Sequence, residues 1–176
     1  MRLTVLSLIA FAAATPALAS AQISTGKSAV LSIQPITAML TFYAGEAELA
    51  VSRSFTLGVG STYWGPSFDD GAFHYLSGDV KVRYYPNATP FQGFSFGGSV
   101  GMTHVSATDN TSQTSGSASG PSIGVMLDYN WLLGAQKGFY VGLGAGAKAV
   151  FISDKDIADK ATVRYPTGRI SVGWAF

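Results

Sequence analysis

His104 and Ser106 are the residues of this sequence whose types and spacing come nearest to a catalytic pair. A histidine can activate a nearby serine hydroxyl when an acidic residue holds the imidazole in the correct tautomer. No glutamate follows Glu48, and Asp109 lies in a stretch rich in serine, threonine and glycine. Because the acidic member is missing, we expect no catalytic residue and no enzyme activity here.

The other candidate sites are weaker. His74 with Asp69 and Asp70 has the residue types of an Asp–His proteolytic site. The nine-residue connection Gly65–Phe73 beside it offers little substrate cleft. Three aspartates have a faint calcium-loop spacing: Asp154, Asp156 and Asp159. They lack the turn glycine and the bidentate glutamate of an EF-hand. The absence of cysteine excludes disulfides and thiolate metal ligands. We therefore predict no metal and no cofactor.

The charged residues are arranged more regularly. The chain has 11 Lys or Arg and 10 Asp or Glu, and without Arg2 this leaves 10 + 10 = 20 charges after residue 21. Eight of them alternate with apolar positions, and the other twelve lie in connections or at segment ends. The eight are Glu46, Glu48, Asp79, Lys81, Arg83, Asp128, Lys148 and Arg169. The near-zero balance leaves no basic field for nucleic acid.

Alternation with a period of two indicates β-strands, whose successive side chains point to opposite faces. Eight such segments follow one another, most of them about ten residues long, as a membrane-spanning strand requires. They are Ser28–Gln34, Leu40–Val51, Phe55–Trp64, His74–Tyr85, Gly93–Val105, Ser122–Trp131, Phe139–Phe151 and Pro166–Phe176. An even number of strands lets a closed up-and-down barrel keep both termini at one end.

The apolar face is predicted to point outward. None of the 20 charges falls on it, and a lipid-facing charge would cost about 2–4 kcal/mol at mid-bilayer. The polar face is rich in glycine, serine and threonine, which suits a narrow interior. The fold class is therefore all-β, an eight-stranded antiparallel up-and-down transmembrane β-barrel with its apolar face outward.

Connections and aromatics indicate an orientation. Short connections (Ser52–Ser54, Pro86–Gln92, Leu132–Lys137) alternate with longer ones (Gly65–Phe73, Ser106–Gly120, Ser153–Arg164), as periplasmic turns and external loops do. We expect Ser106–Gly120 to be an external loop. Aromatic residues gather at the short-turn ends and predict an interfacial girdle there. They are Phe55, Tyr84, Phe94, Phe96, Tyr129, Trp131, Phe139, Trp174 and Phe176.

The first 21 residues have the pattern of a cleaved signal peptide. Met1–Arg2 precedes the apolar run Leu3–Ala14, and small-residue cleavage motifs end at Ala19 and at Ala21. The run is shorter than the about 20 residues of a membrane helix and is followed by Pro16. We expect residues 22–176 to form one exported domain in the bacterial outer membrane.

The chain resembles a known class of proteins. Its ending, Arg169–Phe176 with Trp174 and Phe176 in phase, resembles the signal that outer-membrane assembly machinery recognises. With Tyr43–Gly60 and the glycine-rich Phe139–Gly146, it resembles the small eight-stranded outer-membrane β-barrel proteins, the OmpA/OmpX-like class. The resemblance implies insertion by periplasmic chaperones and the barrel-assembly machinery, and it supplies no catalytic residue. We expect contact with outer-membrane lipids and a monomer.

His104 and Ser106 resemble part of the site of outer-membrane lipid A deacylases. That family carries the pair near the C-terminus, whereas here it lies on a middle strand. An outer-leaflet lipid-modifying enzyme using His104 and Ser106 therefore stays an alternative and not the main prediction.

The eight lumenal charges are expected to pair with one another. An unpaired charge in a narrow interior would cost several kcal/mol. The expected partners are Lys81 and Arg83 for Glu46 and Glu48, and Lys148 or Arg169 for Asp128. The sequence thus predicts a charge-paired, plugged lumen and a structural or surface-interaction role. The alternative within membrane function is a narrow channel for small solutes.

Overall fold

The computed structural model describes residues 26–35, 42–68, 71–109, 114–152 and 161–176. The predicted signal peptide lies outside the described residues. So do five aspartates considered above: Asp69, Asp70, Asp154, Asp156 and Asp159. No helix in the described part of the chain is long and apolar enough to cross a membrane.

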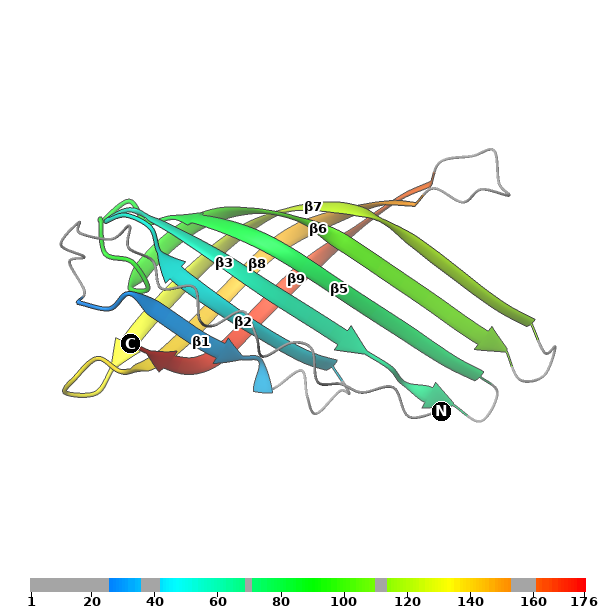
Figure 1. The fold of residues 1–176 in the computed structure, drawn as a ribbon, viewed down its shortest axis with the longest axis horizontal. Coiled ribbons are helices and arrows are strands. Elements are labelled where there is room, and N and C mark those ends of the chain that lie inside the picture. Colours follow the sequence, from blue (N-terminus) through cyan, green and yellow to red (C-terminus); the bar gives the residue numbers. More distant parts are fainter. Residues whose placement is uncertain (1–25, 36–41, 69–70, 110–113, 153–160) are drawn as a thin grey trace.

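The described chain is built from antiparallel strands (Figure 1). They are β1 (Ala29–Ile33), β2 (Phe42–Ala50), β3 (Phe55–Trp64), β4 (Ser67–Phe68), β5 (Gly71–Tyr84), β6 (Gly93–Asp109), β7 (Thr114–Leu133), β8 (Phe139–Ile152) and β9 (Ala161–Ala175). Strands that follow one another in the chain pair with each other, except that β3 does not pair with β4, which pairs with β5 alone. The additional β3–β5 and β1–β9 pairings close a ring of eight strands. This confirms the predicted eight-stranded up-and-down barrel.

Both ends of the described chain meet at one end of the barrel. β1 and β9 pair over Val30–Ile33 and Val172–Ala175. Beyond them, the Ser28 amide donates to the Phe176 carbonyl at 2.6 Å, and the Phe176 amide donates to the Ala29 carbonyl at 2.9 Å. We call this the short-turn end, because the connections 51–54, 85–92 and 134–138 also lie there. The opposite end is called the long-strand end.

Several strands extend farther toward the long-strand end than predicted. Most of Ser106–Gly120, expected to be a loop, continues β6 and β7 in register up to the Asp109–Thr114 pair. β9 begins at Ala161, five residues before the predicted Pro166. Serine and glycine are typical of loops, but cross-strand pairing to neighbouring strands overrides that preference. β4 is a two-residue addition within the predicted loop Gly65–Phe73.

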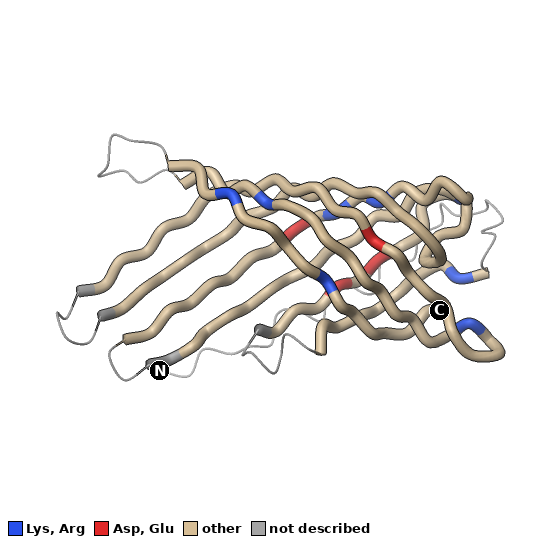
Figure 2. Tube along the Cα trace, turned by 180° about the vertical axis from the view of Figure 1, so that it is seen from behind, with Lys and Arg blue, Asp and Glu red and all other residues tan. Residues whose placement is uncertain are grey.

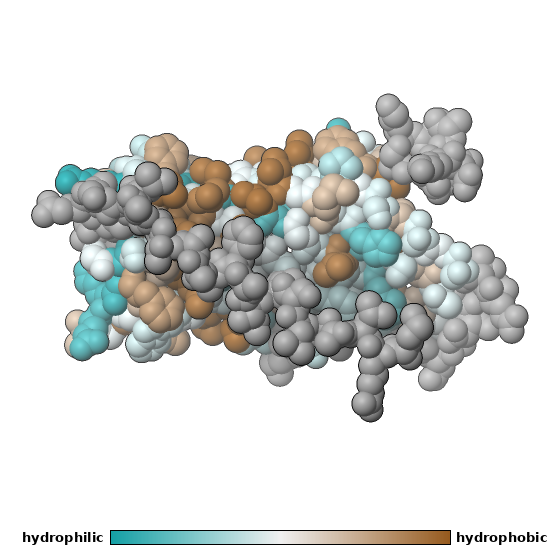
Figure 3. Space-filling model, in the orientation of Figure 1, coloured by the Kyte–Doolittle hydropathy of each residue, from teal (hydrophilic) through white to brown (hydrophobic). Residues whose placement is uncertain are grey.

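The two faces differ as predicted. Outward residues such as Val100 and Val125 are exposed, whereas the largest fully buried side chains point inward. Figure 3 shows apolar side chains gathered over the half of the barrel nearer the short turns, with a more polar surface beyond. Aromatic pairs lie near this end, with ring centroids 5.1 Å apart for Phe55–Tyr84 and 4.7 Å for Tyr129–Trp131.

Candidate functional site in the barrel lumen

The eight charged residues singled out in the sequence all lie inside the barrel. They come from β2, β5, β7, β8 and β9 and alternate with exposed outward residues. Figure 2 shows the acidic residues gathered in the middle of the barrel, whereas basic residues also occur near its ends. Most of the eight have side chains less than one-tenth exposed, and Lys81 is the most accessible at 17%.

Arg83 is the hub of the ion pairs. Its Nη1 lies 2.5 Å from Glu46 Oε1 and 2.9 Å from Glu48 Oε2, and its Nε lies 2.8 Å from Asp128 Oδ2. The guanidinium, from β5, therefore joins carboxylates of β2 and β7 across the interior. The side chain is 1% exposed, so these are charge-assisted contacts away from water.

Two further cations complete this arrangement. Lys81 pairs with Glu46, and Arg169 from β9 lies 3.5 Å from both Glu46 Oε1 and Asp128 Oδ1. We call these three acids and three bases the central network: Glu46, Glu48, Asp128, Lys81, Arg83 and Arg169. The network is neutral. It brings Glu46 and Glu48 to Lys81 and Arg83, and Asp128 to Arg169.

Lys148 pairs elsewhere, which corrects one of the two expected partners of Asp128. Asp128 faces Gly144 on β8, and Lys148 lies four residues farther along that strand, or about 13 Å at the strand rise. Lys148 Nζ instead reaches the opposite wall, 2.7 Å from Asp79 Oδ1. Asp79 also accepts a hydrogen bond from Ser77 Oγ at 3.0 Å. This second unit is named the Asp79–Lys148 pair.

Inward glycines make room for the ion pairs. A Cβ atom added at Gly144 would lie 1.8 Å from Asp128 Oδ1, and one at Gly142 would lie 3.0 Å from Arg169 Nη1. At Gly60, the nearest atom would be Lys81 Nζ at 3.1 Å. The glycine-rich stretch of β8 therefore positions the central network by letting long side chains lie flat against the wall.

Buried aromatic side chains lie at the short-turn end, beneath the network. Tyr85, Phe91 and Tyr140 are fully buried. The Tyr140 hydroxyl donates to Asn130 Oδ1 at 2.6 Å and accepts from Arg169 Nη2 at 2.9 Å. The sequence did not identify this layer, because Phe91 lies in a predicted turn.

Tyr85 connects this aromatic layer to the central network. It lies just beyond the end of β5, and its hydroxyl donates to Glu48 Oε1 at 3.2 Å. Burial, together with the neighbouring Glu48 charge, raises the pKa of Tyr85 well above its usual range. The hydroxyl therefore keeps its proton and remains a donor.

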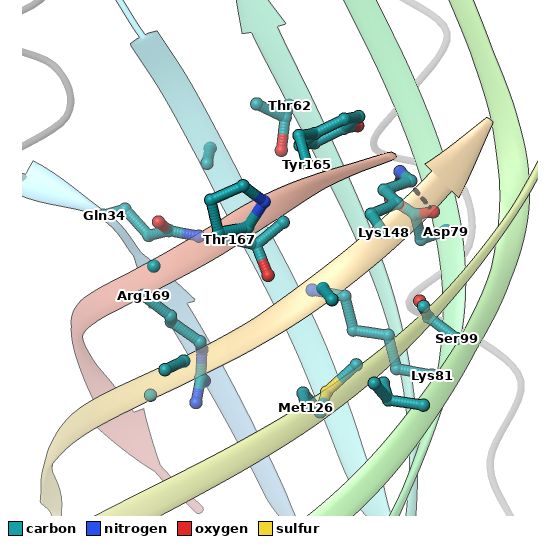
Figure 4. Close-up of a pocket in the computed structure, with 18 of the residues that line it drawn as sticks. Gln34, Thr62, Asp79, Lys81, Ser99, Met126, Lys148, Tyr165, Thr167 and Arg169 are labelled. Atoms are coloured by element: carbon teal, nitrogen blue, oxygen red, sulfur yellow. Dashed lines mark hydrogen bonds and ion pairs between the residues drawn. The ribbon is translucent and has the colours of Figure 1, made fainter. Parts of the chain in front are cut away.

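The long-strand half of the lumen is hollow. A cavity of about 540 Å³ begins above the central network and is bordered by Thr62, Ser99 and Thr167 among other small side chains. Figure 4 shows the Asp79–Lys148 pair at its wall and Tyr165 above it. The lumen thus has a filled half at the short-turn end, occupied by ion pairs and aromatic rings, and a hollow half at the other.

The two histidines lie on the outside of the barrel wall. His104 Nδ1 lies 2.7 Å from Ser119 Oγ, on the neighbouring strand β7, and not at Ser106 or a carboxylate. His74 Nδ1 lies 3.2 Å from the Tyr63 hydroxyl. Within the described residues, no group of three His, Cys, Asp or Glu side chains could hold a metal ion.

Comparisons with known proteins agree with this fold. The crystal structure of the N-terminal β-barrel domain of Pseudomonas aeruginosa OprF is similar to the chain, with a TM-score of 0.51 and 17% sequence identity. The match covers 85% of this chain and 98% of that domain. None of the curated proteins compared with the chain matches it.

The family comparison covers most of the sequence. The model of the family described as "Protein of unknown function (DUF3575)" matches residues 6–161. This match includes most of the predicted signal peptide and all strands up to the first residue of β9. The chain belongs to the DUF3575 family.

Proposed function

We propose that this protein is an outer-membrane β-barrel whose lumen is closed by the central network, and that it has a structural or surface-interaction role. The observation that carries the proposal is the position of Arg83, which joins carboxylates of two other strands in the middle of the lumen. Beneath it lie fully buried aromatic side chains. An ion or solute crossing the barrel would have to separate these contacts.

The outer surface supports a place in a lipid bilayer. Large apolar side chains are exposed on every strand of the ring, including Leu31, Val59 and Val125, which is 66% exposed. A monomer in water would rarely expose so large a continuous apolar surface. The aromatic residues near the short turns suit a membrane interface. We place the short-turn end in the periplasm and the longer strands outside the cell.

Patterns near both ends of the sequence support the proposed export and assembly. The signal-peptide pattern of residues 1–21 would direct export. Periplasmic chaperones and the barrel-assembly machinery would then insert residues 22–176, which would form a monomeric barrel. Trp174 and Phe176 are exposed on the apolar face, where an assembly factor could contact them before insertion.

Single-channel recording tests the closed lumen. Wild-type protein refolded into planar bilayers is expected to show no stepwise conductance. Arg83→Ala combined with Glu48→Ala removes one cation and one anion and should open a passage. Val82→Ala with Leu49→Ala is the matched control, because both side chains face outward from the same strands. Stable conductance of the wild type would favour the narrow channel instead.

A further inference from the structure

Toward the long-strand end, the outer face of the barrel wall becomes polar and the inner face becomes apolar. On β7, Ser115 and Ser119 are exposed on the outside, whereas the inward position Ala118 borders an apolar hollow. Val150 and Ile152 of β8 border the same hollow. Polar-out and apolar-in is the pattern of water-soluble barrels that hold a ligand. The far ends of these strands therefore form a cup that is suited to an apolar ligand.

This cup is a second cavity of about 480 Å³, which we call the outer cup. Its walls come from the far ends of β5, β6, β7, β8 and β9. It shares Phe73, Tyr75 and Tyr165 with the cavity above the central network. The Tyr75 and Tyr165 hydroxyls lie 2.9 Å apart at this junction. The two hollows thus follow one another along the lumen, with an aromatic junction between them.

Basic side chains outnumber acidic ones among the residues that border the deeper cavity. Four cations border it (Lys81, Arg83, Lys148 and Arg169), but only two carboxylates do (Asp79 and Asp128), which gives 4 − 2 = +2. Glu46 and Glu48, the acids that balance this excess, are not among its lining residues. Arg83 Nη2 has no hydrogen-bond partner among the described residues although it is buried. Such an unpaired donor favours the binding of an anionic or polar ligand group nearby.

From these features we propose that the lumen binds a single-chain anionic amphiphile of the fatty-acid type. Its head group lies toward Lys81 in the deeper cavity, and its alkyl chain passes the tyrosine junction into the outer cup. Charge complementarity selects the head, and the apolar inner face of the cup selects the chain. This goes beyond the proposed function and does not depend on whether the lumen conducts.

The test is binding by protein refolded in phosphatidylcholine nanodiscs, with 11-(dansylamino)undecanoate as the fluorescent probe and empty nanodiscs as the blank. Laurate is expected to displace the probe, whereas hexanoate and dodecyltrimethylammonium should not, because one lacks the chain and the other the negative charge. A comparison of laurate with 1-lauroyl-lysophosphatidate then shows whether a free fatty acid or a lysolipid is preferred. No displacement by either anion, or equal displacement by the cationic amphiphile, would overturn the proposal.

Paired variants locate the chain in the outer cup. Ala118→Trp fills the cup and should weaken laurate binding by about tenfold or more, whereas Ser119→Trp, the next residue on the outer face, should leave it within about twofold. Equal effects of the two substitutions would contradict this position of the chain.

A second pair tests the head group without breaking an ion pair. Thr62→Asp places a carboxylate at the deeper cavity and should weaken laurate binding by about tenfold, whereas Thr62→Asn should not. Dodecanol, the neutral analogue, should bind the wild type and both variants equally well in a calorimetric titration without the probe. A loss of laurate binding in Thr62→Asn as large as that in Thr62→Asp would contradict the electrostatic part. A gel-mobility shift on heating confirms that each variant is folded.

Discussion

The two halves of the lumen share the same strands but are filled differently. At the short-turn end, long charged side chains and buried aromatic rings such as Tyr140 meet across the interior. Toward the long-strand end, inward positions carry Thr62, Ser99 and other small residues, and a cavity remains. The barrel fold therefore does not decide whether the interior is closed. The size and charge of the inward side chains at each level decide it.

The largest loss of stability is expected from Arg83→Met. It removes the partner of three carboxylates in the filled half, and breaking a buried ion pair typically costs about 3–5 kcal/mol. The measurement is urea unfolding of the refolded protein in lipid vesicles. Arg164→Met is the control, because Arg164 is exposed and its loss should change the free energy of unfolding by less than about 0.5 kcal/mol. Similar losses for both variants would show that Arg83 is not a hub.

Gly144→Ala should be the next most severe change. The added Cβ would collide with Asp128 Oδ1, and overpacking of this kind typically costs about 1–3 kcal/mol. Gly78→Ala is a matched control, because a Cβ atom added at this strand position would meet no atom within 4 Å. It should be neutral or slightly stabilising. If Gly144→Ala unfolded at the same urea concentration as wild type, Asp128 would have to lie elsewhere.

Lys148→Met, in the hollow half, should cost less than Arg83→Met. Asp79 loses its cation but keeps hydrogen bonds from Ser77 at 3.0 Å and Ser122 at 3.5 Å. The cavity can also admit water to the carboxylate. We expect a loss of about 1–2 kcal/mol in the same urea titration. A loss as large as that of Arg83→Met would erase the energetic difference between the two halves.

Phe176→Ala should have the smallest effect on the stability of the folded barrel. It keeps the backbone hydrogen bonds that Phe176 makes with Ser28 and Ala29, and its side chain is 57% exposed. Assembly in cells should nevertheless fall, as measured by the heat-modifiable fraction in outer-membrane preparations, while export continues. Deletion of Phe176 should impair both assembly and stability. Normal assembly of Phe176→Ala would remove the proposed role of the terminal aromatic ring.

Period-two alternation made the ring predictable, because each strand of the barrel presents one apolar and one polar face. The same alternation identified all eight lumenal charges. The partner of Lys148 was not predictable, since it depends on barrel width and on the height of Asp79 across the lumen. The length of β7 was missed because its serines and glycines are typical of loops. Continuing the alternation through Ala118 and Val150 would have indicated the outer cup.

The central network is tested most directly by a double-mutant cycle of Arg83→Met and Glu48→Gln. Glu48 accepts from Arg83 Nη1 at 2.9 Å and from the Thr56 and Tyr85 hydroxyls. Without Arg83 it is an uncompensated buried carboxylate, so neutralising it should recover part of the loss. The expected coupling is about 0.5–3 kcal/mol in the free energy of unfolding. Losses that add within about 0.5 kcal/mol would show that the two side chains do not interact and would contradict the proposed closure of the lumen.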